Sequence, residues 1–113
     1  MIRYLNPLYV TDKTSDQVKK IKNGIRTGTG MVGYFLITIA TGEHDVLDIL
    51  PIALFKQRSF RHRDHDVIGL AENEQAAFLL VKRIHEEYYD AFHTYSGIKT
   101  ELLRRLGEQE KKN

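Results

Sequence analysis

Four residues with metal-binding side chains follow predicted strands, and together they could hold a metal ion. Carboxylates and one histidine can bind Mg²⁺ or Mn²⁺, and such an ion polarises a phosphate oxygen. The same residue types also favour turns and helix caps, which is the simpler interpretation. A small metal-dependent phosphoryl-transfer or nucleotide-processing enzyme is therefore one hypothesis, resting on Asp12, His44, Asp45 and Glu72.

Basic residues form two groups that could follow a phosphate backbone. The alternative is a solvated helix face and an exposed loop, since the formal net charge of +2 does not by itself indicate nucleic acid. No RNA-binding signature accompanies them. A nucleic-acid-associated accessory protein is the second hypothesis, resting on Lys19, Lys20, Lys22, Arg26, Arg58, Arg61 and Arg63.

Aromatic residues crowd the end of the longest predicted helix. Tyr88 belongs to the apolar stripe of that helix, whereas Tyr89, Phe92 and Tyr95 fall outside it. Exposed aromatic side chains that gather in one place favour association with another protein surface. These three residues are the candidates for self-association, and a homo-oligomer or another protein partner is the corresponding expectation.

The glycines in Gly28–Gly33 match the pattern G-x-G-x-x-G. In a dinucleotide site those glycines follow a strand and open a helix, whereas here they follow a predicted helix and precede a strand. The reversed context favours a helix terminator and a loop; backbone amides that cradle an anion are the alternative. No cofactor is expected.

The composition narrows the classes further. The chain has 113 residues and no cysteine, so it suits one domain and contains no disulfide, thiol nucleophile or cysteine-based metal site. No serine lies in a G-x-S-x-G elbow, and no catalytic residue is assigned. No apolar run approaches the ~20 residues of a membrane span, so a cytoplasmic protein without membrane contact is expected. Residues 1–107 form the predicted domain and 108–113 a polar tail.

The element that organises the chain is a strand followed by a long helix. Val67–Leu70 is a short apolar run whose Gly69 marks a close approach, expected from the following helix. Asn73 is the expected N-cap. Apolar residues then recur at spacings of three and four, which predicts a helix with one buried face: Ala77, Leu80, Val81, Ile84, Tyr88 and Ala91.

The remaining elements precede and follow this unit. Ile2–Val10 predicts a strand that Asn6-Pro7 either shortens or confines to a sheet edge. A capping pattern at Thr14 starts a helix that ends near Gly24. Tyr34–Ala40 and Val46–Leu50 predict a hairpin whose first strand is central, because it is almost continuously apolar. Short and long helices follow at Ile52–Lys56 and Ile98–Leu106.

The expected fold is therefore α/β or α+β, a four-stranded mixed sheet with helices packed on it, in the order β-α-β-β-(short α)-β-α-α. A helix between the first two strands implies that they are parallel. The first, second and fourth strands would then end at one acidic edge that carries the candidate metal ligands. The opposite edge would carry the basic residues. Ligands of open α/β sheets bind beyond the carboxyl ends of the strands.

Val67–Tyr89 also resembles a known group of proteins. A strand ending in Ile68-Gly69-Leu70-Ala71, followed by Ala-x-x-Leu-Val-x-x-Ile-x-x-Glu-x-Tyr, is similar to the C-terminal half of a family of small uncharacterised proteins from Firmicute bacteria, as is Leu47-Asp48-Ile49. The resemblance implies a bacterial, cytoplasmic origin and no particular activity. The leading hypothesis remains a non-catalytic protein-interaction or self-associating module.

Overall fold

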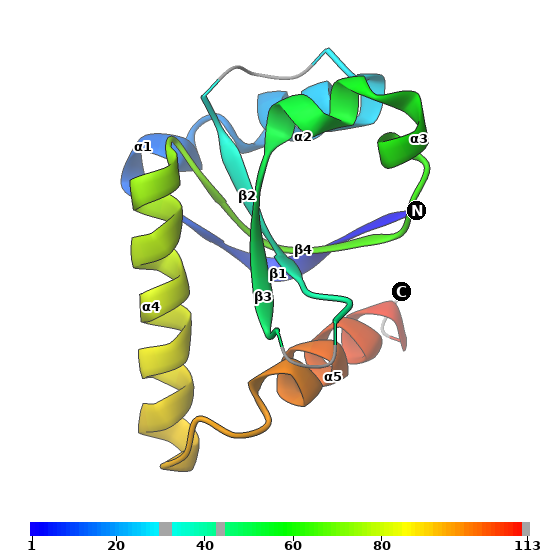
Figure 1. Cartoon of the computed structure of the whole chain (residues 1–113). Helices are drawn as coiled ribbons and strands as arrows, with labels where there is room; N and C mark the ends of the chain where they lie inside the picture. The colour runs from blue at the N-terminus through cyan, green and yellow to red at the C-terminus, as the bar shows by residue number, and fades with distance from the viewer. Residues whose placement is uncertain (30–32, 43–44, 112–113) are drawn as a thin grey trace.

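The computed structural model describes residues 1–29, 33–42 and 45–111, which are built around one four-stranded sheet (Figure 1). The strands are β1 (Ile2–Val10), β2 (Phe35–Ile39), β3 (Leu47–Pro51) and β4 (His65–Ala71), in the spatial order β1-β4-β2-β3. β1 is parallel to β4, whereas β2 is antiparallel to both β4 and β3. The predicted mixed sheet and hairpin are confirmed, and the strand that carries Asn6-Pro7 lies at an edge.

Helices connect and cover these strands. Asn73 caps the long helix as predicted, because its Oδ1 accepts a hydrogen bond from the Ala76 amide at 2.8 Å. Among the described residues, no helix combines the length and the apolar character needed to span a membrane. The helices are α1 (Asp12–Ser15), α2 (Val18–Thr27), the 3₁₀ helix η1 (Ile52–Lys56), α3 (Arg58–Arg61), α4 (Glu74–Phe92) and α5 (Ile98–Lys111).

The strand directions differ from the prediction, which made the first two strands parallel. β2 lies on the far side of β4 from β1 and runs in the opposite direction. α2 crosses the sheet and ends near the amino end of β1, yet β2 begins beside the carboxyl end of β4, where Phe35 pairs with Ala71 (Figure 1). The predicted crossover is therefore wrong.

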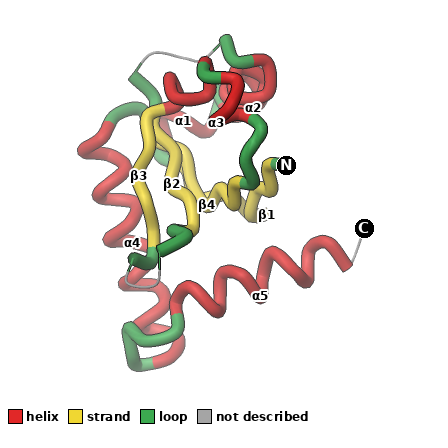
Figure 2. The backbone as a smooth tube through the Cα atoms, turned by 45° about the vertical axis from the view of Figure 1, so that its right-hand side comes forward, coloured by secondary structure: helices red, strands yellow, loops and turns green. Residues whose placement is uncertain are grey.

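Two hydrophobic cores lie on the two faces of the sheet. α4 and α5 cover one face, while α2 and η1 cover the other; Figure 2 shows α4 and α2 on opposite sides of the strands. Burial of both faces explains why β2 and β4 are almost continuously apolar. The first core includes Ile37, Ile68, Ala77, Leu80, Ile84, Ile98, Leu102 and Leu106; the second includes Ile21, Ile25, Leu36, Ile52, Phe55, Val67 and Leu70.

Gly69 marks a close approach, but its neighbour is a strand and not the following helix. A Cβ atom at this position would lie 2.9 Å from the backbone oxygen of Tyr9. The contact arises at an irregularity, because Tyr4 pairs with Val67 while Tyr9 pairs with Gly69, so β1 bulges outward between its two paired segments. The backbone of β1, and not the following helix, therefore excludes a side chain at Gly69.

The final helix runs through Lys111, so it extends into the segment that the sequence predicted as a polar tail. Its last turns hold the irregular part of β1. The Gln109 side chain makes two hydrogen bonds to the backbone of β1 of the kind that a neighbouring strand would make. Its Nε2 donates to the Tyr4 carbonyl at 3.1 Å, and its Oε1 accepts from the Asn6 amide at 2.6 Å. Arg3 adds two hydrogen bonds to Asp66, at 2.7 and 3.0 Å, and one to Glu110 at 3.2 Å.

Candidate functional site

The structure does not assemble the predicted metal ligands. Asp12 and Glu72 line one hollow at the carboxyl ends of β1 and β4, together with Arg83. Asp45 belongs to the β2–β3 connection at the opposite end of the sheet, because β2 is antiparallel to β4. His44 falls outside the described residues. Within the part of the chain that the structure describes, no three metal-binding side chains come together.

Glu72 has a structural contact in that hollow. The Thr11 hydroxyl donates to its Oε2 at 2.8 Å and lies 2.9 Å from the hydroxyl of the buried Thr14. This contact ties the turn after β1 to the turn after β4. The observed contact of Glu72 is therefore a structural link between two turns.

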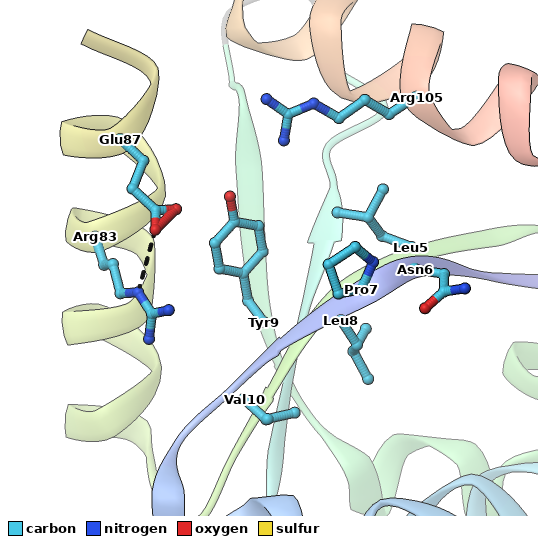
Figure 3. A pocket seen from close by; sticks show the side chains of 9 residues that line it. All are labelled: Leu5, Asn6, Pro7, Leu8, Tyr9, Val10, Arg83, Glu87 and Arg105. Atoms are coloured by element: carbon cyan, nitrogen blue, oxygen red, sulfur yellow. Dashed lines mark hydrogen bonds and ion pairs between the residues drawn. The ribbon is translucent and has the colours of Figure 1, made fainter. Parts of the chain in front are cut away.

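A second hollow lies where β1 bulges beneath α4 and α5, with a volume of about 320 Å³ (Figure 3). Tyr9 points from the strand toward Glu87 of α4 and Arg105 of α5 (Figure 3). Burial and the neighbouring Glu87 carboxylate raise the pKa of the Tyr9 phenol, against the opposing effect of Arg105. Sequence reasoning missed this hollow, and its only local signal was the strand break at Asn6-Pro7.

The charges around Tyr9 already compensate one another. Arg83 lies 3.5 Å from Glu87, and Arg105 lies 3.5 Å from Glu101. An anionic ligand would have to compete with these carboxylates for both guanidinium groups. The arrangement is therefore better suited to fastening α4 and α5 over the bulge than to binding an anion.

The basic residues converge more closely than the metal candidates. Lys22 and Arg26 of α2 and Arg61 of α3 line a hollow of about 360 Å³ beside the N-terminal half of β1. Its apolar lining comes from Met1, Ile2 and Tyr4. The prediction of a basic edge is thus correct in part, although the predicted direction of β2 was wrong. The end of α2 and the whole of α3 lie near the amino ends of the parallel strands β1 and β4.

Each of these three cations is held by a neutral group. The Lys22 Nζ lies 4.5 Å from the centre of the Tyr4 ring, and Arg26 Nη2 donates to the Asn23 side chain at 2.6 Å. Arg61 Nη1 donates to the Phe55 carbonyl at 2.9 Å. Across the described ranges, no carboxylate lies within 4.0 Å of any of the three.

The other predicted basic residues extend this surface. Lys19 and Lys20 are exposed on α2, Arg58 is exposed on α3, and Arg63 is exposed just after it. The Arg63 guanidinium lies 5.7 Å from the Phe60 ring. α2, η1 and α3 contain no aspartate or glutamate, so the helices over this face of the sheet carry positive charge alone.

The Arg61 guanidinium occupies the space that a side chain at position 28 would fill. Gly28 is the left-handed C-cap of α2, with φ of 76°, and a Cβ atom there would lie 1.8 Å from Arg61 Nη1. The first glycine of the glycine-rich motif therefore terminates a helix, as its context indicated, and also makes room for a guanidinium. Residues 30–32 of the motif are outside the described part.

Tyr4 makes the stability of this region sensitive to alkaline pH. Burial raises the pKa of its phenol from 10.0 to about 12. Since the folded state holds this proton more tightly than the unfolded chain, the contribution is complete below pH 10 and is lost as the pH rises toward 12. We expect the free energy of unfolding to fall over that range, and to fall less steeply in Tyr4→Phe. Urea titrations of both proteins measure this difference, and equal slopes would contradict it.

The predicted self-association residues form an exposed aromatic cluster. Tyr89, Phe92 and Tyr95 are 42%, 47% and 58% exposed, respectively. The Tyr89 and Tyr95 rings stack with centres 4.7 Å apart, and Phe92 lies 4.6 Å from the ring of Tyr88. The aromatic side chains at the end of α4 therefore contact one another and remain partly exposed to solvent.

The exposed side of α4 also carries a regular stripe that sequence reasoning missed. Phe78, Lys82, His85, Tyr89 and Phe92 follow one another at spacings of four, three, four and three. This is the spacing of a helix–helix seam. Phe78 is 59% exposed, although the core face of α4 is already satisfied by Ala77, Leu80 and Ile84. The helix thus has one apolar face in the core and a second, partly apolar seam outside it.

These features define a small α+β protein with helices on both faces of a mixed sheet, an aromatic seam on one helical layer and a basic hollow on the other. No family model matches the chain, and the comparisons with curated proteins and with solved structures gave no match.

Proposed function

We propose that the protein is a non-catalytic module that associates with a second copy of itself through the outer seam of α4. The observation that carries this proposal is the heptad spacing of Phe78, Lys82, His85, Tyr89 and Phe92 on a helix whose core face is separately buried. Exposed aromatic residues at random positions need no explanation, but a regularly spaced seam with aromatic residues at both ends is a surface that a partner helix can pack against.

The seam is complementary to itself in an antiparallel arrangement. Two copies of α4 related by a two-fold axis between residues 83 and 84 bring Phe78 of each copy against Tyr89 of the other. Lys82 then lies opposite His85 of the other copy, with Glu86 of that copy one position further along the helix, within reach of the Lys82 ammonium. In the isolated chain Lys82 and Glu86 already form a loose pair at 3.9 Å. Because a two-fold interface repeats each contact, one apolar pair and one charge pair are each formed twice.

The size of the seam limits the expected strength of the proposed dimer. An aromatic side chain can bury about 150–250 Å², and Phe78, Tyr89 and Phe92 are each about half exposed. Three such side chains in each copy place the apolar area at roughly 500–700 Å², below the ~1,600 Å² total of a standard interface unless neighbouring residues contribute. We therefore expect a weak dimer, with a dissociation constant in the micromolar range or above.

Sedimentation velocity over about 1–200 µM tests the proposal, since that range brackets micromolar dissociation. The wild-type chain should shift from monomer to dimer, and Phe78→Ser with Tyr89→Ser should remain monomeric throughout. Leu103→Ser is the matched control, because Leu103 is 40% exposed on α5, away from the seam. A wild-type chain that stays monomeric, or a control that dissociates equally, would contradict the seam.

Charge exchange gives a second, independent readout. Lys82→Glu should weaken the dimer because it places like charges near the axis, and adding Glu86→Lys should restore it. The expected change is small, about 0.2–1 kcal/mol for each pair. Restoration by the second substitution would identify the antiparallel register, whereas further weakening would exclude it.

A further inference from the structure

We propose that the hollow beside the N-terminal half of β1 binds a nucleotide unit. The phosphate would contact Lys22, Arg26 and Arg61, and the base would lie against Ile2 and, in place of the Lys22 ammonium, against the Tyr4 ring. This inference does not depend on the dimer, because the hollow belongs to the α2 and α3 layer and the seam belongs to α4.

The first argument is that the three cations of the hollow are not paired with carboxylates of the described chain. Four arginines elsewhere are paired with acids: Arg3 with Asp66 and Glu110, Arg83 with Glu87, Arg104 with Glu101 and Glu108, and Arg105 with Glu101. Among the described residues, Arg58 and Arg63 of the same basic surface have no such ion pair, as is true of the cations in the hollow. The three cations of the hollow are held only by an aromatic ring, an amide oxygen and a carbonyl oxygen. A ligand phosphate would therefore gain charge-assisted hydrogen bonds there without displacing a carboxylate of the described chain.

The preorganisation of Arg61 is the second argument. Its guanidinium passes over Gly28, where a side chain would collide with it, and one of its nitrogens is anchored on the Phe55 carbonyl. An anchored guanidinium loses less side-chain entropy when it binds an oxyanion than a freely moving one does. The hollow thus contains one positioned fork donor, flanked by two further cations from α2.

The apolar wall is the third argument, and it selects among phosphate ligands. Inorganic phosphate would use the cations and leave Ile2 and Tyr4 exposed. A duplex would present its phosphates but keep its bases stacked inside, out of reach of a concave wall. A free nucleotide or an unpaired strand uses both parts, since a base can lie on an apolar or aromatic side chain. The volume of about 360 Å³ falls within the range of small-ligand sites.

The exposed basic residues beyond the hollow should distinguish a free nucleotide from an unpaired strand. Lys19 and Lys20 continue along α2, and Arg58 and Arg63 lie on and after α3. Phosphates on either side of a bound nucleotide would pass these cations, whereas a free nucleotide would not reach them. A strand should therefore bind more tightly and with a steeper dependence on salt than the free nucleotide.

Binding measurements at low salt test the inference on the full chain. The probes are a fluorescein-labelled 12-mer oligothymidylate and its duplex by anisotropy, and AMP, ATP and inorganic phosphate by calorimetry. We expect the single strand to bind more tightly than the duplex, and AMP more tightly than phosphate. Each of Lys22→Gln, Arg26→Gln and Arg61→Gln should weaken binding about tenfold, the loss expected for one charge-assisted hydrogen bond.

Two controls distinguish a site from general attraction to polyanions. Arg104→Gln removes a carboxylate-paired cation from α5 and should leave binding unchanged. Lys19→Gln with Lys20→Gln should weaken the strand but leave AMP unaffected. Thermal melts of each variant confirm that the fold is retained.

Each pattern of results decides the inference. If AMP and the strand both depend on Lys22, Arg26 and Arg61, the hollow is a nucleotide site; if only the strand does, it is a single-strand site. Three results would overturn the inference. The first is a duplex that binds as tightly as the single strand. The second is a loss of affinity in the Lys19 and Lys20 double variant that equals the loss in the hollow variants, and the third is no binding of any probe.

Discussion

Leu102→Ala is expected to lower the free energy of unfolding by about 2–5 kcal/mol, the range for removing a buried leucine side chain. Leu102 is 2% exposed and lies in the core between α5 and the sheet, beside Ile98 and Leu106. α5 is the last helix and holds the bulge of β1 through Gln109, so a cavity beneath it weakens both the core and the edge strand.

The adjacent leucine provides a matched control for this substitution. Leu103 is in the same helix but is 40% exposed, so Leu103→Ala should change the unfolding free energy by less than about 1 kcal/mol. Urea denaturation followed by circular dichroism measures both, and the slope of the transition shows whether α5 separates before the rest unfolds. Equal effects of the two substitutions would mean that α5 is not docked as the structure shows.

Gly69→Ala is expected to destabilise the protein by about 1–3 kcal/mol, the usual cost of forcing extra atoms into a packed interior. The added Cβ would lie 2.9 Å from the Tyr9 carbonyl oxygen and 3.3 Å from the Ile37 side chain. The first neighbour is backbone, so it cannot rotate away, and relief requires β1 to move from β4. Because Tyr9 also lines the hollow beneath α4, the displacement should extend to the contacts of α4 and α5 with the bulge.

Substitution of a second glycine, Gly107, is expected to change the unfolding free energy in the opposite direction. Gly107 lies within α5, and a Cβ atom there would meet nothing within 4 Å. Gly107→Ala should therefore stabilise the protein by about 0.5–1 kcal/mol, because alanine loses less backbone entropy in a helix. Chemical denaturation of the two alanine variants beside the wild type gives both signs in one experiment. A neutral Gly69→Ala would show that β1 does not approach β4 this closely.

The two proposed surfaces lie on different layers of the molecule. The seam belongs to α4, on the face of the sheet whose core includes Ile84, and the basic hollow belongs to α2 and α3, on the face whose core includes Ile25. A dimer formed through α4 would therefore carry two basic hollows. If both proposals hold, dimerisation should raise the apparent affinity for a long single strand and leave the affinity for a free nucleotide unchanged, because only the strand can reach both hollows.

Short-range patterns predicted most of the local elements, but both ends of the first helix were wrong. α2 spans Val18–Thr27 and is not capped by Thr14, and it continues past Gly24 to the left-handed C-cap at Gly28. Asn73 caps α4 because one side-chain oxygen next to the first turn suffices to satisfy an amide. Phe35–Ile39 forms a buried central strand because a continuous apolar run tolerates burial on both faces. Exposure of Tyr89 and Phe92 followed from their displacement from the core stripe. Each of these depends on residues within a few positions of one another.

The tertiary structure alone decided which distant residues meet. Asp45 is separated from Glu72 because β2 enters the sheet on the far side of β4, and no residue near either one encodes that choice. Lys22 and Arg61 come together because α2 and α3 pack on the same face of the sheet. Strand order and direction depend on pairing between segments far apart in the chain, where the loop-closure cost varies only slowly with length. Local sequence fixes which segments form helices and strands, whereas competition among all possible pairings determines where their side chains converge.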